Sequence, residues 1–284
     1  MRVLVLGASG MIGSAMIRVL SQTDWQIFGS MRSGEAMRFF TPEIAGKMLT
    51  FVDINNRDSL VRAVAQVRPD VVINCIGLTK HHAEADDPLL AIPINALMPH
   101  QLAELCLAAS ARLIHVSTDC VFSGAKGNYS ESDAADAKDV YGKSKFLGEV
   151  LGAGAVTLRT STIGHELQSA YGLLEWFLAQ QASCKGFNKA IFSGLPNVVF
   201  AEVVRDIVIP RPELSGLYHV GAAPIGKYEL LKLIASVYGK TIDIQMDNNF
   251  VMDRSLDVSR FREATGYVAP AWPRLIDIMH SSKQ

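Results

Sequence analysis

The chain has 284 residues, of which 49% are hydrophobic and 19% charged, and its formal net charge is −1. This length and composition are typical of a water-soluble globular protein with one large domain or two smaller ones. The Lys and Arg residues are scattered rather than clustered, which excludes the electrostatic footprint of a protein that binds nucleic acid or an anionic membrane surface. We therefore expect a small-molecule partner, and neither nucleic acid nor membrane.

The cysteines stand far apart and have neither CxxC nor Cys/His ligand spacing: Cys75, Cys106, Cys120 and Cys184. This spacing predicts no metal site and no disulfide framework. The opening MRVLVLGASG has an apolar run shorter than the roughly 7–15 residues of a signal peptide's apolar region. No apolar run approaches the ~20 residues of a membrane span. We therefore expect a cytoplasmic protein with reduced thiols.

Short apolar runs alternate with helical patterns through the first 160 residues. The helical patterns include 59–67 and 95–109, where Leu, Val and Ala recur at three- and four-residue intervals. Pro99 belongs to the first turn of the second of these helices, or kinks it. The apolar runs are 3–6, 25–28, 48–52, 71–74, 113–117 and 155–159. Near-continuous apolar strands separated by helices predict an α/β fold with a doubly wound parallel sheet.

The composition and the spacing of apolar residues change beyond residue 164. An aromatic-rich stretch at 171–180 is followed by turn residues at 193–197 and by a Pro-rich segment, which predicts a smaller and less regular domain. We expect a cofactor-binding domain at 1–164 and a substrate-binding domain at 165–284. Some C-terminal segments are expected to return and pack on the sheet.

A glycine-rich loop, GASGMIG, follows the first predicted strand and opens a helix. Glycines permit a tight turn and close backbone approach, and a helix N-terminus offers unpaired N–H groups to a pyrophosphate. This context favours a Rossmann-type dinucleotide site over a purely structural turn. The residues expected to form it are Gly7, Ser9, Gly10, Met11, Ile12 and Gly13.

Arg32 and Ser33 stand about 20 residues after the glycines, where a ribose-binding Asp or Glu would indicate NAD. A guanidinium is always charged and binds phosphate oxygens in a bidentate manner, so Arg32 suits a 2′-phosphate. The position favours NADP(H) over NAD(H), which stays open. A surface arginine in a loop is the alternative.

Thr118 ends the fifth predicted strand, and Tyr141 and Lys145 lie one helical turn apart on the next helix. Ligands of open α/β sheets bind at the carboxyl ends of the strands, so these three side chains can converge on a carbonyl beside a nicotinamide. Because tyrosine has an ordinary pKa of ~10, we expect the Lys145 ammonium to lower the pKa of Tyr141.

A second pair with the same spacing, Tyr228 and Lys232, lies in KYELLKLIASVYG. It follows neither a glycine loop nor a hydroxyl at a strand end. Its helix has an apolar stripe, so we interpret this pair as incidental and expect the Tyr228 ring to lie against the C-terminal domain.

The sequence resembles the extended short-chain dehydrogenase/reductases, and most closely the dTDP-4-dehydrorhamnose reductase (RmlD-like) branch. The resemblance covers nearly the whole chain, and its motifs occur in order at family spacing. They are GASGMIG at 7–13, VDI at 52–54, NCIG at 74–77, STDCVFSG at 117–124, YGKSK at 141–145 and LRTS at 158–161, with weaker matches at 194–197 and 253–261.

The resemblance implies a role for each matching residue. Thr118 would polarise the substrate carbonyl, Tyr141 would donate the proton, and Lys145 would bind the nicotinamide ribose. Asp53 and Ile54 would contact adenine. The backbone of Cys75, Ile76 and Gly77 would line the cofactor.

Other residues are interpreted from their place in the family pattern. Asn95 is expected to be a structural hydrogen bonder. His81 and His82 lie in a loop that borders the substrate in the family, although solvated loop residues are the alternative. The residues expected to contact substrate are Trp176, Asn197 and Arg254.

The resemblance implies an NADPH-dependent reductase of a nucleotide-activated 4-keto-6-deoxy sugar, with a homodimer among the expected assemblies. Two departures leave the sugar nucleotide open: Cys120 replaces the family's usual Tyr, and 162–164 reads TIG instead of WVY. A sugar-nucleotide dehydratase or epimerase is one alternative, although a dehydratase would need Glu at Cys120. The other is a non-catalytic regulatory subunit like the β subunit of methionine adenosyltransferase.

Overall fold

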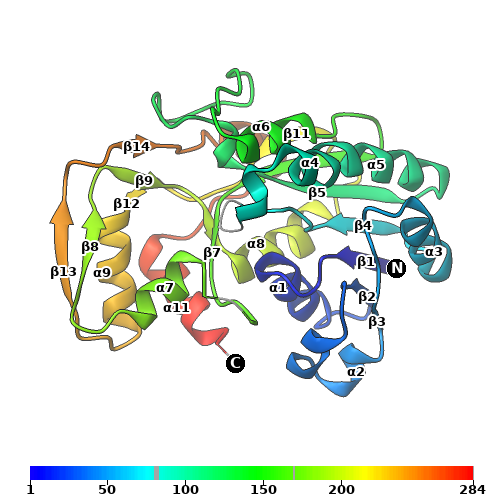
Figure 1. The fold of residues 1–284 in the computed structure, drawn as a ribbon, viewed down its shortest axis with the longest axis horizontal. Helices are drawn as coiled ribbons and strands as arrows, with labels where there is room; N and C mark the ends of the chain where they lie inside the picture. The colour runs from blue at the N-terminus through cyan, green and yellow to red at the C-terminus, as the bar shows by residue number, and fades with distance from the viewer. Residues whose placement is uncertain (80–82, 169, 284) are drawn as a thin grey trace.

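A seven-stranded parallel sheet forms the centre of the molecule (Figure 1). The structure is a computed structural model that describes residues 1–79, 83–168 and 170–283. The strand order is β11-β6-β5-β4-β1-β2-β3, which reverses direction at β1 and so makes the sheet doubly wound. The strands are β1 (Arg2–Leu6), β2 (Gln26–Ser30), β3 (Met48–Leu49), β4 (Val71–Asn74), β5 (Arg112–Thr118), β6 (Ala155–Thr160) and β11 (Gly216–His219).

Alternate residues of each strand point into two separate cores. On β1, Val3 and Val5 belong to a core with α1 (Met11–Leu20) and α8 (Asn197–Val203). Leu4 and Leu6 face the opposite core, which is formed with α3 (Arg57–Val67) and α5 (Met98–Ala108). This two-sided burial explains why the strands are apolar throughout, and it confirms the predicted α/β fold.

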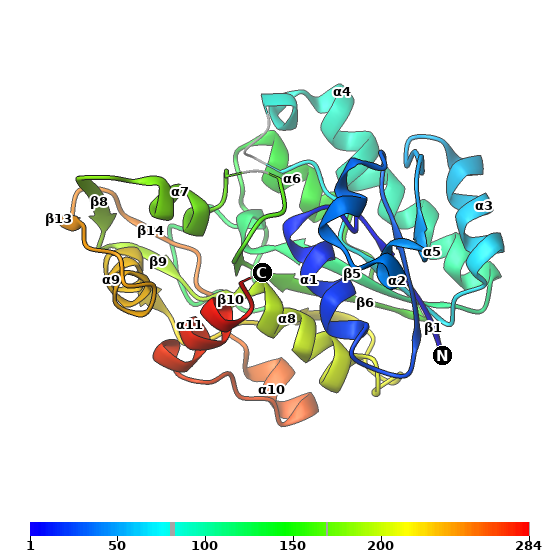
Figure 2. The same cartoon turned by 90° about the horizontal axis from the view of Figure 1, so that it is seen from below.

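The smaller lobe at the left of Figure 1 is built from helices and short strands of the C-terminal half. Its strands pair as β7 (Thr162–Ile163) with β10 (Leu195–Pro196), β8 (Ser183–Phe187) with β13 (Asp243–Asp247), and β9 (Ala190–Phe192) with both β12 (Ile225–Gly226) and β14 (Met252–Asp253). Its helices are α7 (Leu173–Ala179), α9 (Lys227–Val237) and α11 (Trp272–Ser281), with α10 (Ser259–Thr265) below them in Figure 2.

The two parts of the chain are interleaved rather than merely linked. Strand β11 is the edge strand beside β6, with Gly216 opposite Val156. Helix α8 packs on α1, and α11 lies beside α8 in both views (Figures 1 and 2). The division into domains at residue 164 stays a prediction.

The observed elements differ from the predicted ones mainly at their ends and in one helix. The predicted strand at 48–52 is shortened to β3, while 71–74 coincides with β4. The predicted helix at 95–109 is divided into a π-helix, η3 (Ile92–Leu97), and α5, with Pro99 in the first turn of α5. Helical residues run without a break from α4 (Pro88–Ala91) through η3 into α5, and Met98 N donates to Pro93 O, so Pro99 directly follows a π-helical segment of one continuous helix.

The remaining helical segments are short and connect the larger elements. They are α2 (Pro42–Ala45), α4 (Pro88–Ala91), α6 (Val140–Leu147), and the segments η1 (Glu35–Phe39), η2 (Ala83–Asp86), η4 (Asp119–Val121) and η5 (Val204–Val208). Within the described residues, no helix is both long enough and apolar enough to cross a lipid bilayer.

The core shared by both halves yields a test of this architecture. Phe200 of α8 is completely buried in it, so Phe200→Ala should lower the free energy of unfolding by about 3–5 kcal/mol through lost burial and a residual cavity. Urea unfolding followed by circular dichroism measures this change. Phe51→Ala is the matched control, because the Phe51 side chain is 78% exposed and its loss should change stability by no more than about 0.5 kcal/mol. Equal effects of the two substitutions would contradict the packing described.

Candidate active site

The glycine loop connects β1 to α1 and leaves the N-terminus of that helix open. Gly7 has φ +82°, a conformation that favours glycine. A Cβ at Gly13 would lie against the Gly7 carbonyl and 3.1 Å from Ala8 Cα, so only glycine lets the helix approach the strand so closely. No side chain caps α1, and its first turn contains no acidic residue. The loop and helix end can therefore accept an anion.

Arg32 and Ser33 follow β2 at the same edge of the sheet, and both are exposed. Ser30 at the end of β2 lies opposite Leu6 and accepts a hydrogen bond from Ala8 N, which places this segment beside the glycine loop. Arg32 forms no hydrogen bond or ion pair with any residue that the structure describes. Its guanidinium is thus available to an anionic group at this edge.

Asp53 and Ile54 lie next to that segment. Val52 N donates to Met31 O at 3.2 Å, which brings the two chain segments together after β3 and β2. The Asp53 carboxylate accepts from Asn55 N at 3.0 Å, and the Asp53 backbone N–H donates to Ser59 Oγ at 3.1 Å. These contacts fix the turn in which the adenine contact is predicted.

Two buried polar side chains hold the segment Cys75–Ile76–Gly77 in place where it follows β4. Asn74 Oδ1 accepts from Ile76 N at 3.1 Å, and Asn74 Nδ2 lies 3.1 Å from His115 Nδ1. Both side chains are fully buried. Their hydrogen bonds hold the backbone that the sequence predicts to line the cofactor.

Thr118 and Tyr141 meet at the carboxyl end of β5. Thr118 Oγ1 accepts from Cys120 N at 3.1 Å and lies 3.1 Å from Asp119 Oδ1, to which it donates. Tyr141 lies in the first turn of α6, whose N-cap Asp139 accepts from Gly142 N. The Thr118 side chain lies close enough to Tyr141 to act on its pKa. Two hydroxyl groups are therefore presented together at the strand end.

Burial raises the pKa of Tyr141, assisted by Cys120 and opposed by the nearby Thr118 side chain. The sequence predicts the opposite direction, a pKa lowered by Lys145. That prediction is wrong for the structure as described, because desolvation of the phenolate outweighs the other effects. Tyr141 is consequently a protonated phenol at neutral pH, as a proton donor must be.

Lys145 is buried behind Tyr141, and its Nζ donates to Val116 O at 2.9 Å. Burial lowers the pKa of Lys145 to about 8, and the negative charge of Glu149 opposes this shift. The ammonium form therefore predominates at neutral pH. Nζ also lies 3.8 Å from the position of a Cβ at Gly77, so it faces the cofactor-lining segment after β4.

A cavity of about 600 Å³ brings about half of the predicted site residues together, including all three catalytic candidates. Thr118, Tyr141 and Lys145 line it, together with Gly10, Met11, Ile12, Cys75, Ile76, Gly77 and Trp176. The remaining predicted residues lie outside its lining: Gly7, Ser9, Gly13, Arg32, Ser33, Asp53, Ile54, Asn197 and Arg254.

Sequence reasoning missed most of the opposite wall of this cavity. Thr160 and Ser161 line it at the end of β6 and belong to the LRTS motif, to which the sequence assigned no site role, while Thr162 begins β7 and the TIG segment that leaves the sugar nucleotide open. The C-terminal half adds side chains from separate elements, to which no motif or periodicity assigns a site role: Glu166, Tyr171, Lys185, Phe187, Phe192, Lys227 and Leu231.

The three predicted substrate residues have different positions. Trp176 of α7 is 39% exposed and lines the cavity. Asn197 is buried, and its Nδ2 donates to Met11 O at 3.1 Å and to His165 O at 3.3 Å, so it links backbone segments instead of facing substrate. Arg254 lies behind Cys120, with Nη1 donating to Cys120 Sγ at 3.2 Å.

Asn95 makes the structural hydrogen bonds expected of it. Its Oδ1 accepts from Leu78 N at 2.9 Å, and its Nδ2 donates to Leu78 O at 3.0 Å and to Ser144 Oγ at 3.1 Å. It thereby ties η3 to α6 beside the cavity. His81 and His82 lie outside the described residues.

The second Tyr–Lys pair, Tyr228 and Lys232, does not line the cavity. Lys232 Nζ sits 5.3 Å from the centre of the Tyr228 ring and 3.5 Å from Glu229. A Cβ at Gly186 would lie 2.8 Å from Tyr228 Cδ2, so the ring packs on β8. The pair is thus part of the packing of α9 on the smaller lobe.

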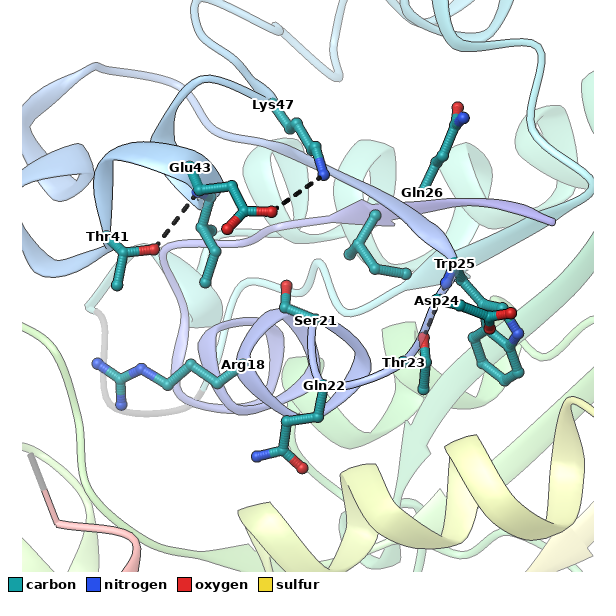
Figure 3. A pocket seen from close by; sticks show the side chains of 12 residues that line it. Arg18, Ser21, Gln22, Thr23, Asp24, Trp25, Gln26, Thr41, Glu43 and Lys47 are labelled. Atoms are coloured by element: carbon teal, nitrogen blue, oxygen red, sulfur yellow. Dashed lines mark hydrogen bonds and ion pairs between the residues drawn. The ribbon is translucent and has the colours of Figure 1, made fainter.

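A second cavity, of about 520 Å³, lies at the carboxyl end of α1 and the amino end of β2, the opposite edge of the sheet (Figure 3). Arg18 and Lys47 line it together with Asp24 and Glu43, and Lys47 lies 3.8 Å from Glu43. Its charges are balanced, so they select no ligand class. None of the predicted site residues lines it. Within the described residues, no three His, Cys, Asp or Glu side chains are grouped to hold a metal ion.

Comparison with known proteins places the chain among characterised relatives. The chain is 28% identical over 259 residues to methionine adenosyltransferase 2 subunit beta of Xenopus laevis, covering 84% of this chain and 72% of that protein. It is 26% identical over 233 residues to dTDP-4-dehydrorhamnose reductase of Aggregatibacter actinomycetemcomitans, covering 78% and 74%. Its fold matches the crystal structure of dTDP-4-dehydrorhamnose reductase from Bacillus anthracis in complex with NADP, with a TM-score of 0.82 at 20% identity over 99% of both chains.

The family model described as RmlD substrate binding domain matches residues 1–242, which is most of the chain. The predicted resemblance is therefore confirmed, and the chain belongs to the RmlD family of extended short-chain dehydrogenase/reductases.

Proposed function

We propose that this chain is an NADPH-dependent reductase that acts on the keto group of a nucleotide-activated 4-keto-6-deoxy sugar. One observation carries the proposal: Thr118, Tyr141 and Lys145 line the same cavity as the N-terminus of α1. A proton donor and a dinucleotide-binding loop then act on one bound substrate. The relatives named as dTDP-4-dehydrorhamnose reductases support the substrate class.

The residues at the sheet edge fit a dinucleotide phosphate. The uncapped first turn of α1 would hold the pyrophosphate, and the unpaired Arg32 would hold the 2′-phosphate. Gly77 and Lys145 would lie beside the nicotinamide ribose. When bound, the cofactor supplies the hydride that reduces the carbonyl carbon.

The chain's own residues supply the proton and the electrostatic environment. Thr118 and Tyr141 place two hydroxyl groups at the carbonyl oxygen, and the Tyr141 phenol gives its proton to that oxygen. The adjacent Lys145 ammonium stabilises the phenolate that remains. Because Tyr141 stays protonated in the resting site, the reduction begins with the donor in the required state.

Two alternatives differ from this proposal in measurable ways. A dehydratase needs a carboxylate base, and the position after Asp119 is occupied by Cys120. A regulatory subunit, as the methionine adenosyltransferase relatives suggest, would bind the dinucleotide without turnover. The shared cavity lining by all three catalytic candidates favours an enzyme, since binding alone does not require them.

The assay that tests the proposal mixes the purified protein with NADPH and a panel of dTDP- and UDP-linked 4-keto-6-deoxy sugars. Loss of nicotinamide absorbance, with one NADP⁺ formed per sugar reduced, is the expected result. Formation of a 4-keto-6-deoxy product from a dTDP- or UDP-hexose without net cofactor consumption would show a dehydratase. Tight NADPH binding without turnover of any sugar in the panel would favour the regulatory subunit.

Arg32 is expected to set the cofactor preference. Arg32→Ala should remove most of the preference for NADPH over NADH and leave NADH affinity nearly unchanged, because a charge-assisted contact contributes about 10- to 150-fold in affinity. Titration of cofactor fluorescence measures both affinities. Arg62→Ala removes an exposed arginine from α3 and should preserve the preference. Equal NADPH and NADH affinities in the unmutated protein would contradict the assignment.

Tyr141 and Tyr228 provide a matched pair of substitutions. Tyr141→Phe should keep the fold and NADPH binding but lower kcat by ~10²–10⁴, the usual contribution of a positioned general acid. Tyr228→Phe removes the same hydroxyl from a ring that packs on β8, so turnover should stay near normal. Steady-state kinetics with NADPH and the best sugar of the panel compare them. The reverse pattern would require the mechanism to be abandoned.

A further inference from the structure

Three side chains at four-residue spacing contact successive residues at the end of β5. Tyr141 lies beside Thr118 in the cavity lining, and Lys145 Nζ donates to Val116 O at 2.9 Å. Glu149, just beyond the end of α6, accepts a hydrogen bond from Ser117 Oγ at 2.8 Å. The spacing that places Tyr141 and Lys145 in the site thus continues to a third residue, which the sequence analysis did not single out.

The Glu149 carboxylate is fixed from a second strand as well. Arg159 of β6 lies opposite Ser117 in the sheet, and its Nε and Nη2 each donate to the carboxylate at 2.7 Å. The side chains of Arg159 and Glu149 are 2% and 4% exposed. Arg159 Nη1 lies 3.2 Å from His219 Nε2 on the next strand, β11. A buried bidentate pair of this kind holds a carboxylate in one place.

We infer that Glu149 is a positioning residue for the reduction: its carboxylate, clamped by Arg159 and Ser117, is the fixed counter-charge that keeps Lys145 an ammonium ion and anchors the strand end carrying Thr118. The inference rests on the proposed function, because it concerns the same site. It assigns a task to a residue that touches neither the cavity nor the reacting atoms.

The other groups around Lys145 supply no comparable charge. Burial raises the pKa of Cys75 to about 12, so Cys75 is an uncharged thiol. Tyr141 is protonated, and burial keeps the pKa of His115 well below its ordinary value, so that imidazole is neutral. Burial alone lowers lysine pKa values to as little as about 5–6. Lys145 keeps a pKa of about 8, with Glu149 the largest influence that raises it.

The test measures the titration of Lys145 directly, by NMR of 13C-labelled lysine in the full chain without cofactor or substrate. The Lys145 signal is assigned by its loss in Lys145→Met. In the unmutated protein it should titrate near pH 8. In Glu149→Gln, which keeps the shape but removes the charge, it should titrate about one pH unit lower. The alkaline limb of kcat/KM, which reports the free enzyme, should move by the same amount.

Glu131→Gln is the matched control, because the Glu131 carboxylate accepts from His219 N at 2.8 Å in the same region and is not among the groups that shift the pKa of Lys145. It should leave the Lys145 titration in place. If Glu149→Gln does not fold, Glu149→Gln combined with Arg159→Gln removes both charges of the buried pair and should still lower the titration of Lys145.

A Lys145 signal that titrates at the same pH in the unmutated protein and in a folded Glu149 variant would overturn the inference. So would an equal shift in Glu131→Gln. Since the NMR measurement needs no sugar substrate, its outcome is separate from the turnover assay. A shifted titration in a protein without reductase activity would refute the proposed function and retain the electrostatic role of Glu149.

Discussion

The positive charge of Lys145 lies in a buried place with little access to water, and several surrounding groups stabilise it. The residue is 4% exposed, so desolvation favours its neutral form. The Val116 carbonyl accepts a hydrogen bond from Lys145 Nζ, and the Glu149 carboxylate supplies an opposite charge that raises the pKa of Lys145. That carboxylate would itself be too costly to bury without the two donors of Arg159. The charge on Lys145 is therefore stabilised through two layers of the fold.

The parallel sheet makes these layers possible because its strand ends lie side by side at one edge. Ser117 and Arg159 are neighbours across β5 and β6, and His219 is the neighbour of Arg159 on β11. The C-terminal half of the chain thus contributes a residue to the support of a site whose catalytic candidates all lie in the N-terminal half. Because β11 belongs to the central sheet, its His219 contacts Arg159 and so supports the site from the C-terminal half.

Sequence reasoning predicted the features that depend on local pattern. The glycine loop, the apolar strands and the Tyr141–Lys145 spacing are local, and the fold and the shared cavity agree with them. It failed where the outcome depends on distant parts of the chain. The raised pKa of Tyr141 results from burial, which spacing does not reveal. Asn197 was predicted to contact substrate, but it is the partner of a carbonyl 186 residues away.

Asn197 also connects the two sides of the cavity, the start of α1 and the segment before α7. Its amide joins Met11, at the start of α1, to His165, which begins the segment leading to α7. His165 in turn lies 2.8 Å from Glu175 Oε1 and 3.0 Å from the Tyr238 hydroxyl, so the same residue connects α7 with the end of α9.

Both of those helices contribute to the wall of the cavity, α7 through Trp176 and α9 through Leu231. Hydrogen bonds through Asn197 and His165 therefore connect the start of α1 with Glu175 of α7 and Tyr238 at the end of α9. In the proposed reaction the sugar carbonyl would have to meet both Tyr141 and the nicotinamide, and productive geometry in such a site depends on distances set to within about 1 Å. A buried amide fixed by two backbone carbonyls is suited to that task, because its side chain has one orientation that satisfies both acceptors.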